Sequence, residues 1–314
     1  MAFLLRRAGH ALVVLVGVTV VVFAIVHLVP GDPVRIAMGT RFDPEVYEAL
    51  RRASGLDQPL PQQYLSYVTS AVTGDLGVSF RSGEPVTQIL LSRLPATLSL
   101  AGVGIVVALA MAFPLGIWSA LHHGRASDAV VRAVSQVGVS VPDFWMGLLL
   151  ILLFSSTLGW LPPSGYVPLT EDPLQWARRV AMPGVTVGLV AGSILTRYVR
   201  SSVLESLSMD HVRTAESKGL RRRVVLGRHV VRNALVPVLT ITGTQLATML
   251  GGLIVVEVVF AWPGLGRLVF DAVSARDYPL LQGAVLLIAA IFLLVNLVVD
   301  VLYARVDPRI RVSS

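Results

Sequence analysis

The chain alternates between long apolar runs and shorter polar segments. Six runs are each about as long as the roughly 20 residues that a helix needs to cross the hydrocarbon core of a bilayer. They cover residues 9–29, 96–121, 134–158, 180–203, 236–260 and 280–303. This pattern predicts an all-α polytopic membrane protein with six transmembrane helices, which puts both chain ends on the same side of the membrane.

The polar segments divide the chain into three parts. Residues 1–30 form the first transmembrane helix, which we expect to be retained because its apolar run is too long for the core of a signal peptide. Residues 31–95 form a small subdomain, and residues 96–314 form a core of five transmembrane helices with a polar loop at 206–235. Within the subdomain, the stretch "DPEVYEALRRASG" predicts a helix with Asp43 as N-cap, Pro44 at its first position and Gly55 at its end.

The flanking cations give the orientation. One side of the membrane receives fourteen Lys and Arg residues in its short segments, whereas the short loops on the other side hold four. Cytoplasmic loops collect Lys and Arg. We therefore expect both termini, residues 122–130 and the loop 206–235 to be cytoplasmic, and residues 31–95 to be outside.

Composition narrows the possible functions. The residues are 54% hydrophobic and only 14% charged, so the net charge of +7 reflects cytoplasmic loops and not nucleic-acid binding. The chain has no cysteine and lacks a P-loop, an H-E-x-x-H zinc motif and a nucleophilic serine turn. We therefore expect no enzyme, no metal and no cofactor bound by this chain. If it moves solute uphill, energy must come from a partner.

Small and ionisable residues within the apolar runs indicate how the helices pack and where a functional site could lie. Gly184, Gly188 and Gly192 share one helix face, as do Ala108, Ala112 and Gly116, and such ridges allow close helix packing. Pro114 and Pro142 predict kinks. Ionisable side chains are costly in lipid, so Asp143 and Glu257 are candidates for a translocation pathway or a subunit interface; local pairing of Glu257, with Arg267 for example, is the alternative.

One basic segment interrupts the apolar pattern. Residues 211–237 read "HVRTAESKGLRRRVVLGRHVVRNALVP" and contain seven Lys or Arg residues. Asp210 is a possible N-cap and Gly219 a possible C-terminal glycine, which predicts a short helix over residues 211–218. A helix this short needs a partner surface. It could dock in a groove of a peripheral protein, or the segment could be a basic loop facing anionic lipid.

The segment resembles the coupling loop in membrane subunits of bacterial ATP-binding-cassette importers. That family has a Glu-Ala-Ala motif, three further residues, a glycine and a later proline. Here Arg213, Thr214 and Ala215 fall on the motif, Gly219 on the glycine, and Pro237 comes later than usual. Because the leading Glu is missing, Glu216 is the candidate for the acidic contact with the ATPase.

The resemblance extends over nearly the whole chain. "LVPGDPVRIAMG", "GLDQPLPQQYLSYVTSAVTGDLGVSF" and "FAWPGLGRLVFDAVSARDYPLLQG" are similar to the dipeptide, oligopeptide and nickel permease group, and to the first of its two permease subunits. The resemblance implies an ATP-driven importer for peptides in the bacterial inner membrane. It leaves open the exact solute among dipeptides, longer peptides, glutathione and nickel chelates.

The resemblance also implies partners and site residues. The partners would be a second homologous permease subunit, one or two ATPase subunits that bind ATP and Mg, an extracytoplasmic substrate-binding protein and membrane lipid. The implied docking residues for the binding protein are Trp262, Arg267 and Asp277. The implied ATPase-coupling residues are Arg213, Thr214, Ala215, Glu216, Ser217, Lys218 and Gly219. A stand-alone carrier or channel and a non-transporting scaffold remain the alternatives.

Overall fold

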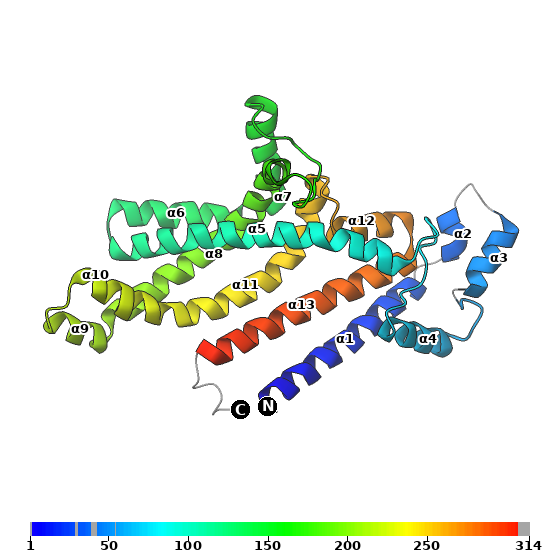
Figure 1. Cartoon of the computed structure of the whole chain (residues 1–314), viewed down its shortest axis with the longest axis horizontal. Helices are drawn as coiled ribbons and strands as arrows, with labels where there is room; N and C mark the ends of the chain where they lie inside the picture. Colours follow the sequence, from blue (N-terminus) through cyan, green and yellow to red (C-terminus); the bar gives the residue numbers. More distant parts are fainter. Residues whose placement is uncertain (1, 29–30, 39–42, 54, 307–314) are drawn as a thin grey trace. The chain divides into compact units, whose positions relative to one another are not determined.

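The computed structural model describes residues 2–28, 31–38, 43–53 and 55–306 of the 314-residue chain. Its helices are α1 Ala2–Leu28, α2 Pro33–Met38, α3 Pro44–Ala53, α4 Leu60–Val72, α5 Val86–Leu121, α6 Ala126–Ser140, α7 Asp143–Leu150, η1 Ile151–Thr157, α8 Pro173–Ser208, α9 Asp210–Ser217, α10 Arg222–Val224, η2 Val225–Val231, α11 Arg232–Val259, α12 Leu265–Ala275 and α13 Tyr278–Val306 (Figure 1). The η elements are π-helices. The predicted all-α class is confirmed.

Four helices are long and apolar enough to cross a membrane. They contain the spans Gly9–Leu28, Val86–Leu121, Pro173–Ser208 and Tyr278–Val299. The number rises to six if each of two bent helix pairs counts as one span. The chain is therefore a polytopic membrane protein, whereas the six-helix layout stays a prediction. The predicted cytoplasmic segment 304–314 lies mostly outside the described residues.

In one of the bent pairs, a proline divides a predicted transmembrane helix into two. The run predicted over 134–158 is two helices, because α6 ends at Ser140 and α7 begins at Asp143 with a bend of 105° between them. Pro142 lacks an N–H and forces the preceding Val141 into an extended conformation (φ −88°, ψ 126°), which ends α6. By contrast, α5 continues through Pro114 without interruption. The expected kink at Pro142 is thus a break.

The helices separate into two compact units, which we describe one at a time. Unit 1 comprises Met1–Thr97 and Pro263–Leu294. Its core joins the start of α5 to α12 and α13 through Val86, Leu90, Leu265 and Leu280. The side chain of Thr97 accepts a hydrogen bond of 2.8 Å from the Leu265 N–H and so fixes the start of α12.

The predicted helix of the 31–95 segment is present in unit 1 as α3. Asp43 Oδ1 accepts hydrogen bonds from the Glu45 and Val46 N–H groups, at 2.9 and 3.4 Å, which is the expected N-cap geometry. Gly55 follows the helix with φ +64°. The caps therefore set both ends of this helix, as the sequence indicates.

Unit 2 comprises Leu98–Trp262 and Val295–Ser314. Its centre is α8, which packs against α6, α7 and α11 (Figure 1). The predicted glycine ridge of α8 faces the predicted small-residue ridge of α5. A Cβ atom on Gly188 would lie 2.6 Å from Val107, and one on Gly192 would lie 3.1 Å from the Cα of Ala108. The small residues therefore permit the close approach of the two helices.

Candidate functional site

The basic segment of unit 2 contains the predicted short helix. It is α9, which follows α8 after a turn at Met209 and packs against both α8 and η2. The helix begins at Asp210, so Asp210 is not the N-cap; the N-cap is Met209, which forms no side-chain cap bond. Asp210 instead lies 3.8 Å from the Arg213 guanidinium, one turn further along the helix.

The end of α9 has the predicted geometry. Gly219 follows the helix with φ +73°, and its N–H donates a hydrogen bond of 2.9 Å to the carbonyl of Glu216. A Cβ atom at this position would meet no atom within 4 Å. The demand for glycine therefore comes from the backbone conformation alone and not from lack of space.

The two faces of α9 differ sharply. Val212 and Ala215 are buried, 1% and 5% exposed, against the chain itself. Arg213, Thr214, Glu216 and the other polar residues of the motif are exposed: Ser217, Lys218 and Gly219. The side chain of Ala215, one of the implied coupling residues, therefore packs against the chain itself.

Side chains around the start of α9 connect this end of unit 2 to η2 and α11, the helices that follow it in the chain. His211 Nε2 lies 2.8 Å from Asn233 Nδ2 at the start of α11. The buried Ser206 hydroxyl at the end of α8 donates to the Val230 carbonyl at 3.1 Å. The short helix is thus held at the tip of a hairpin formed by α8 on one side and η2 with α11 on the other.

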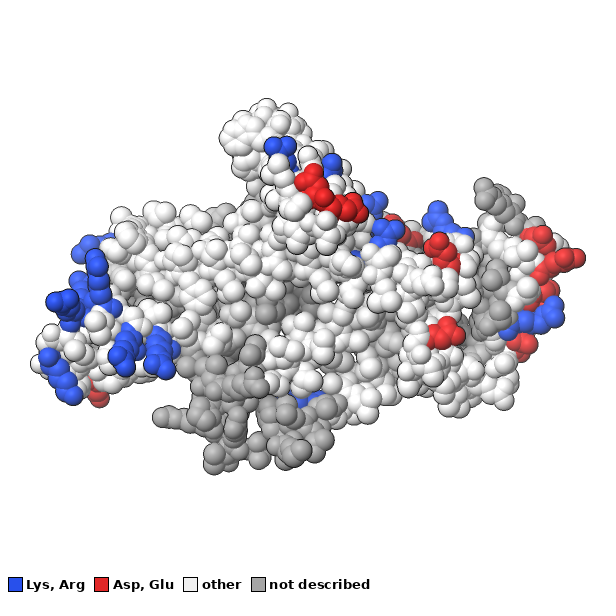
Figure 2. Space-filling model, viewed as in Figure 1, with Lys and Arg blue, Asp and Glu red and all other residues white. Residues whose placement is uncertain are grey.

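Cations surround this tip. Arg221, Arg222, Arg223, Arg228 and Arg232 are all exposed. In Figure 2, Lys and Arg gather around α9 and α10, with little acidic surface beside them. This end of unit 2 can therefore attract an acidic protein surface or lipid phosphates.

A second polar cluster, which we call the Asp128 cluster, lies between α5, α6 and α8 in unit 2. The Asp128 carboxylate is 1% exposed and accepts hydrogen bonds from Arg200 Nε at 2.8 Å and Nη2 at 3.0 Å. The Ser119 hydroxyl and the Gly124 N–H also donate to it, at 2.6 and 3.1 Å. Sequence reasoning missed this cluster, although Arg200 within an apolar run was a signal.

The two predicted pathway carboxylates lie in unit 2. Asp143 is the first residue of α7, at the break after Pro142, and is partly exposed. Its Oδ2 lies 2.9 Å from the place of a Cβ atom on Gly252, so the missing side chain at 252 makes room for the carboxylate next to α11. Glu257, near the end of α11, is fully buried within the chain.

The three predicted docking residues have different environments. Trp262 is 0% exposed and contacts the Tyr166 ring edge-on, with centroids 4.8 Å apart. Asp277 is 1% exposed and accepts hydrogen bonds from the Ser79 hydroxyl at 2.5 Å and the Phe80 N–H at 3.2 Å. Only Arg267 is partly exposed, with Asp271 3.9 Å away. Direct contact with a partner is therefore open to Arg267, whereas the side chains of Trp262 and Asp277 are buried within their own units.

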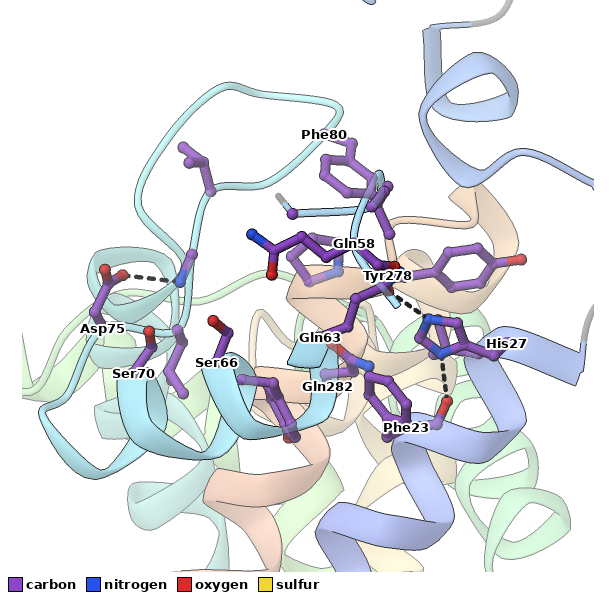
Figure 3. Close-up of a pocket in the computed structure, with 18 of the residues that line it drawn as sticks. Phe23, His27, Gln58, Gln63, Ser66, Ser70, Asp75, Phe80, Tyr278 and Gln282 are labelled. Carbon is purple, nitrogen blue, oxygen red and sulfur yellow. Dashed lines mark hydrogen bonds between the residues drawn. The ribbon is translucent and has the colours of Figure 1, made fainter. Parts of the chain in front are cut away.

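Unit 1 contains a pocket that the sequence did not indicate. It encloses about 310 Å³ between the end of α1, α4, the loop before α5 and the start of α13 (Figure 3). His27 bridges two of these elements, with Nε2 2.9 Å from Gln63 Oε1 and Nδ1 2.8 Å from the Phe23 carbonyl. The Tyr67 hydroxyl is enclosed, and burial raises the pKa of Tyr67 to about 12. The polar lining can hold water or a small hydrogen-bonding solute.

Known families of proteins match nearly the full length of the chain. Residues 112–312 match the family described as "Binding-protein-dependent transport system inner membrane component", and residues 1–101 match the N-terminal family of such membrane components. A solved structure described as an amino acid ABC transporter with histidines is similar in fold, with a TM-score of 0.50 at 18% identity over 71% of this chain and 94% of that chain.

Curated relatives align from end to end. The chain is 41% identical to the di/tripeptide transport system permease protein DppB of Pseudomonas aeruginosa, over 99% of each chain. It is 40% identical to the dipeptide transport system permease protein DppB of Escherichia coli K12, over 98% of each chain, and to a putative peptide transport system permease protein of Brucella abortus, over 99% of each. The predicted resemblance is confirmed: this chain belongs to the inner-membrane permease family of binding-protein-dependent transport systems, as a multi-pass, non-enzymatic subunit of an ABC importer.

Proposed function

We propose that the chain forms one half of the pore of an ATP-driven importer for peptides, with di- or oligopeptides as its solutes. The substrate class is supported by the full-length identity of 40–41% to permeases named for dipeptide and di/tripeptide transport. The other half of the pore is a second homologous permease subunit. An extracytoplasmic binding protein delivers the peptide, and Arg267 is the exposed docking residue proposed for it.

The proposed topology has six transmembrane helices and both termini in the cytoplasm. Residues 1–30 form the first helix, 31–95 an extracytoplasmic subdomain, and 96–314 the core, with the coupling loop 206–235 inside. The asymmetry of flanking cations supports this orientation. Because the chain has no cysteine, single introduced cysteines can test it. Ser82→Cys should react with an impermeant thiol reagent in intact cells, and Ser217→Cys only after permeabilisation.

The coupling role falls to α9. The observation that carries it is the division of α9 into a buried face, held by α8 and η2, and an exposed polar face at the tip of the hairpin. A helix supported in this way moves together with α8 and α11. An ATPase subunit that binds the exposed face can therefore transmit its closure to the pore helices. ATP and Mg bind to that ATPase and not to this chain.

The test is ATPase association and ATP-driven uptake of a labelled dipeptide by the reconstituted complex. Gly219→Val should disturb the end of α9, because a β-branched residue disfavours φ near +73°, whereas Gly219→Asn should be tolerated. Glu216→Lys should weaken ATPase binding at least about tenfold, because it replaces the proposed acidic contact with the ATPase by a positive charge. Glu171→Lys, in a loop before α8, is the matched control.

Two results would reject the coupling role. One is normal ATPase binding and uptake in both Gly219→Val and Glu216→Lys. The other is equal loss in Gly219→Val and Gly219→Asn, which would mean that the left-handed conformation is not the cause. Transport by the chain alone, driven by an ion gradient without ATP, would favour the stand-alone carrier instead.

A further inference from the structure

A groove runs between α6 and α8 in unit 2. It encloses about 790 Å³ and is lined by three small residues, one isoleucine and five long polar side chains: Arg132 and Gln136 from α6, and Arg197, Tyr198 and Arg200 from α8. Two of the lining arginines, Arg132 and Arg200, also belong to or lie beside the Asp128 cluster. Nothing in the coupling function or the peptide pathway described above requires a basic groove at this place.

The groove has more positive than negative charge. Arg200 is bound to the Asp128 carboxylate by two hydrogen bonds of 2.8 and 3.0 Å. Arg132 is only loosely associated with the same carboxylate, at 3.7 Å, and its side chain is 57% exposed. Arg197 is exposed and forms no ion pair with any residue that the structure describes. The groove lining therefore contains three guanidinium groups and no carboxylate, and Arg132 and Arg197 are available to bind an anion.

The sequence of α8 places the groove near a membrane surface. The stretch 180–195 contains no charged residue and would extend about 24 Å as a helix. Arg197 and Arg200 follow directly, at the level where lipid headgroups begin. Exposed aromatic side chains lie near these arginines in the sequence or at a helix end. Tyr198, next to Arg197 on α8, is 45% exposed, and Trp118, near the end of α5, is 54% exposed. Tyr and Trp are enriched at membrane–water interfaces.

The neighbouring face of α6 suits an acyl chain. Val130, Val134 and Val137 repeat at helical spacing and are 61%, 59% and 60% exposed. They lie next to the positions of α6 that line the groove, Ala129, Ala133 and Gln136. An anion that also carries a hydrocarbon chain would use both surfaces, whereas a free inorganic anion would use only the groove.

We propose that this groove binds the phosphate of an anionic phospholipid. Arg132 and Arg197 hold the phosphate oxygens, for which guanidinium groups are well suited, while Arg200 stays bound to Asp128. Gln136 and Tyr198 supply neutral hydrogen-bonding groups for the rest of the headgroup. Since α8 continues directly into the turn before α9, a lipid in the groove stabilises the part of unit 2 that supports α9. This proposal does not depend on which solute is transported.

The experiment compares lipid binding by variants of the purified transport complex in nanodiscs. Phosphatidylglycerol in a phosphatidylcholine background is the probe, and lipid retention is measured by native mass spectrometry. Arg132→Gln and Arg197→Gln should each weaken retention of phosphatidylglycerol about fivefold, the effect expected for one interfacial charge. The double variant should show no preference over phosphatidylcholine. Arg197→Lys should retain most of the preference because the positive charge remains.

Arg178→Gln, an exposed arginine near the other end of α8, is the matched control and should bind phosphatidylglycerol as the wild type does. Arg132 and Arg197 are both exposed, so their loss should leave the thermal unfolding temperature in pure phosphatidylcholine unchanged. Undiminished retention in the double variant would overturn the proposal. So would competition by millimolar inorganic phosphate, which would indicate a site for free anions. Crosslinking of Arg197→Cys to the second permease subunit by a maleimide–benzophenone reagent would also overturn it, because it would place a subunit interface at the groove.

Discussion

Among the residues whose burial the structure describes, each unit buries one aspartate, and the two are stabilised by different means. Asp128 in unit 2 and Asp277 in unit 1 are both 1% exposed. Each holds a turn against an element far away in the sequence: Asp128 joins the turn before α6 to α8, and Asp277 joins the turn at Ser79 and Phe80 to the start of α13. Asp128 is neutralised by the Arg200 guanidinium. Asp277 forms no ion pair within the described residues and accepts only from neutral donors.

The two sites should therefore differ in how much stability is lost when one partner of the aspartate is removed. A charged pair fails badly when one partner is removed, because the other charge stays buried and uncompensated. A carboxylate held by several neutral donors loses stability in smaller steps, one hydrogen bond at a time. We therefore expect the Asp128 cluster to depend mainly on one residue, and the Asp277 site to depend on the sum of its donors.

Arg200→Met should give the largest effect. It removes the main cation beside the buried Asp128 carboxylate and leaves the longer contact to the exposed Arg132 at 3.7 Å. We expect a loss of about 3 kcal/mol, at the lower end for buried pairs because the Arg200 side chain is 17% exposed. The measurement is thermal unfolding of the purified permease complex in nanodiscs. Adding Asp128→Asn to this variant should restore part of the loss. Arg178→Met is the control, and an equal loss in the control would refute the special role of the pair.

Asp277→Asn should give an intermediate effect. The amide nitrogen cannot accept a hydrogen bond, so either the Ser79 hydroxyl or the backbone donors of Phe80 and Leu280 lose a partner. We expect a loss of about 1–3 kcal/mol in the same unfolding measurement. Asp271→Asn, on the exposed side of α12, should cost much less. A loss larger than that of Arg200→Met would reverse the ranking of the two sites.

Two buried serines allow a matched comparison. Ser119 donates to Asp128 at 2.6 Å and Ser79 donates to Asp277 at 2.5 Å, and both are almost fully buried. Ser79→Ala should cost about 1.5 kcal/mol, because only backbone N–H groups remain on Asp277. Ser119→Ala should cost about 0.5 kcal/mol, because Arg200 still satisfies Asp128. Equal losses would mean that the ion pair gives no protection against the loss of a neutral donor.

Neither aspartate site could be predicted from the sequence. Their distant partners, Arg200 for Asp128 and Ser79 for Asp277, lie 72 and 198 positions away, and hydrophobic periodicity reports only which residues are apolar. Asp277 was predicted as a docking residue from its motif, and Arg200 passed unnoticed within the run 180–203. Long-range polar pairing depends on how helices pack, which a single sequence does not specify.

Local features were predicted well because their causes are local. The Asp43 cap of α3, the left-handed Gly219 and the small-residue ridges of α5 and α8 follow from side-chain chemistry within a few residues or from steric size, whereas the pairing of the two ridges was not predicted. The break at Pro142 was underestimated as a kink. Helix ends were also misplaced: α5 begins at Val86, ten residues before its apolar run, because polar residues extend the helix beyond the part that lipid requires.

A third aspartate, which is only partly buried, should show the smallest effect on stability. Asp32 is partly exposed and accepts hydrogen bonds from the Tyr47 hydroxyl at 2.6 Å and the Arg35 N–H at 3.1 Å. Partial burial alone would raise the pKa of Asp32, but these hydrogen bonds and the charge of Arg51 outweigh it and leave the pKa below its ordinary value of 3.8. This contribution to stability is therefore present above that ordinary value and is lost as the pH falls through the lower pKa of the folded state.

Tyr47→Phe removes the hydroxyl that contributes most to lowering the pKa of Asp32. The folded-state pKa should rise toward or above 3.8, so the variant should lose less stability than the wild type between about pH 5 and pH 3. The measurement is the difference in unfolding temperature between the two complexes at each pH, which cancels the titration of the other carboxylates. In an Asp32→Asn background, Tyr47→Phe should leave no pH-dependent difference. If the plots of unfolding temperature against pH for wild type and Tyr47→Phe are parallel, solvent screening removes the effect at this exposed site. If they converge as the pH falls, the Tyr47 hydroxyl stabilises the Asp32 carboxylate, with a smaller effect than the donors of the two buried aspartates.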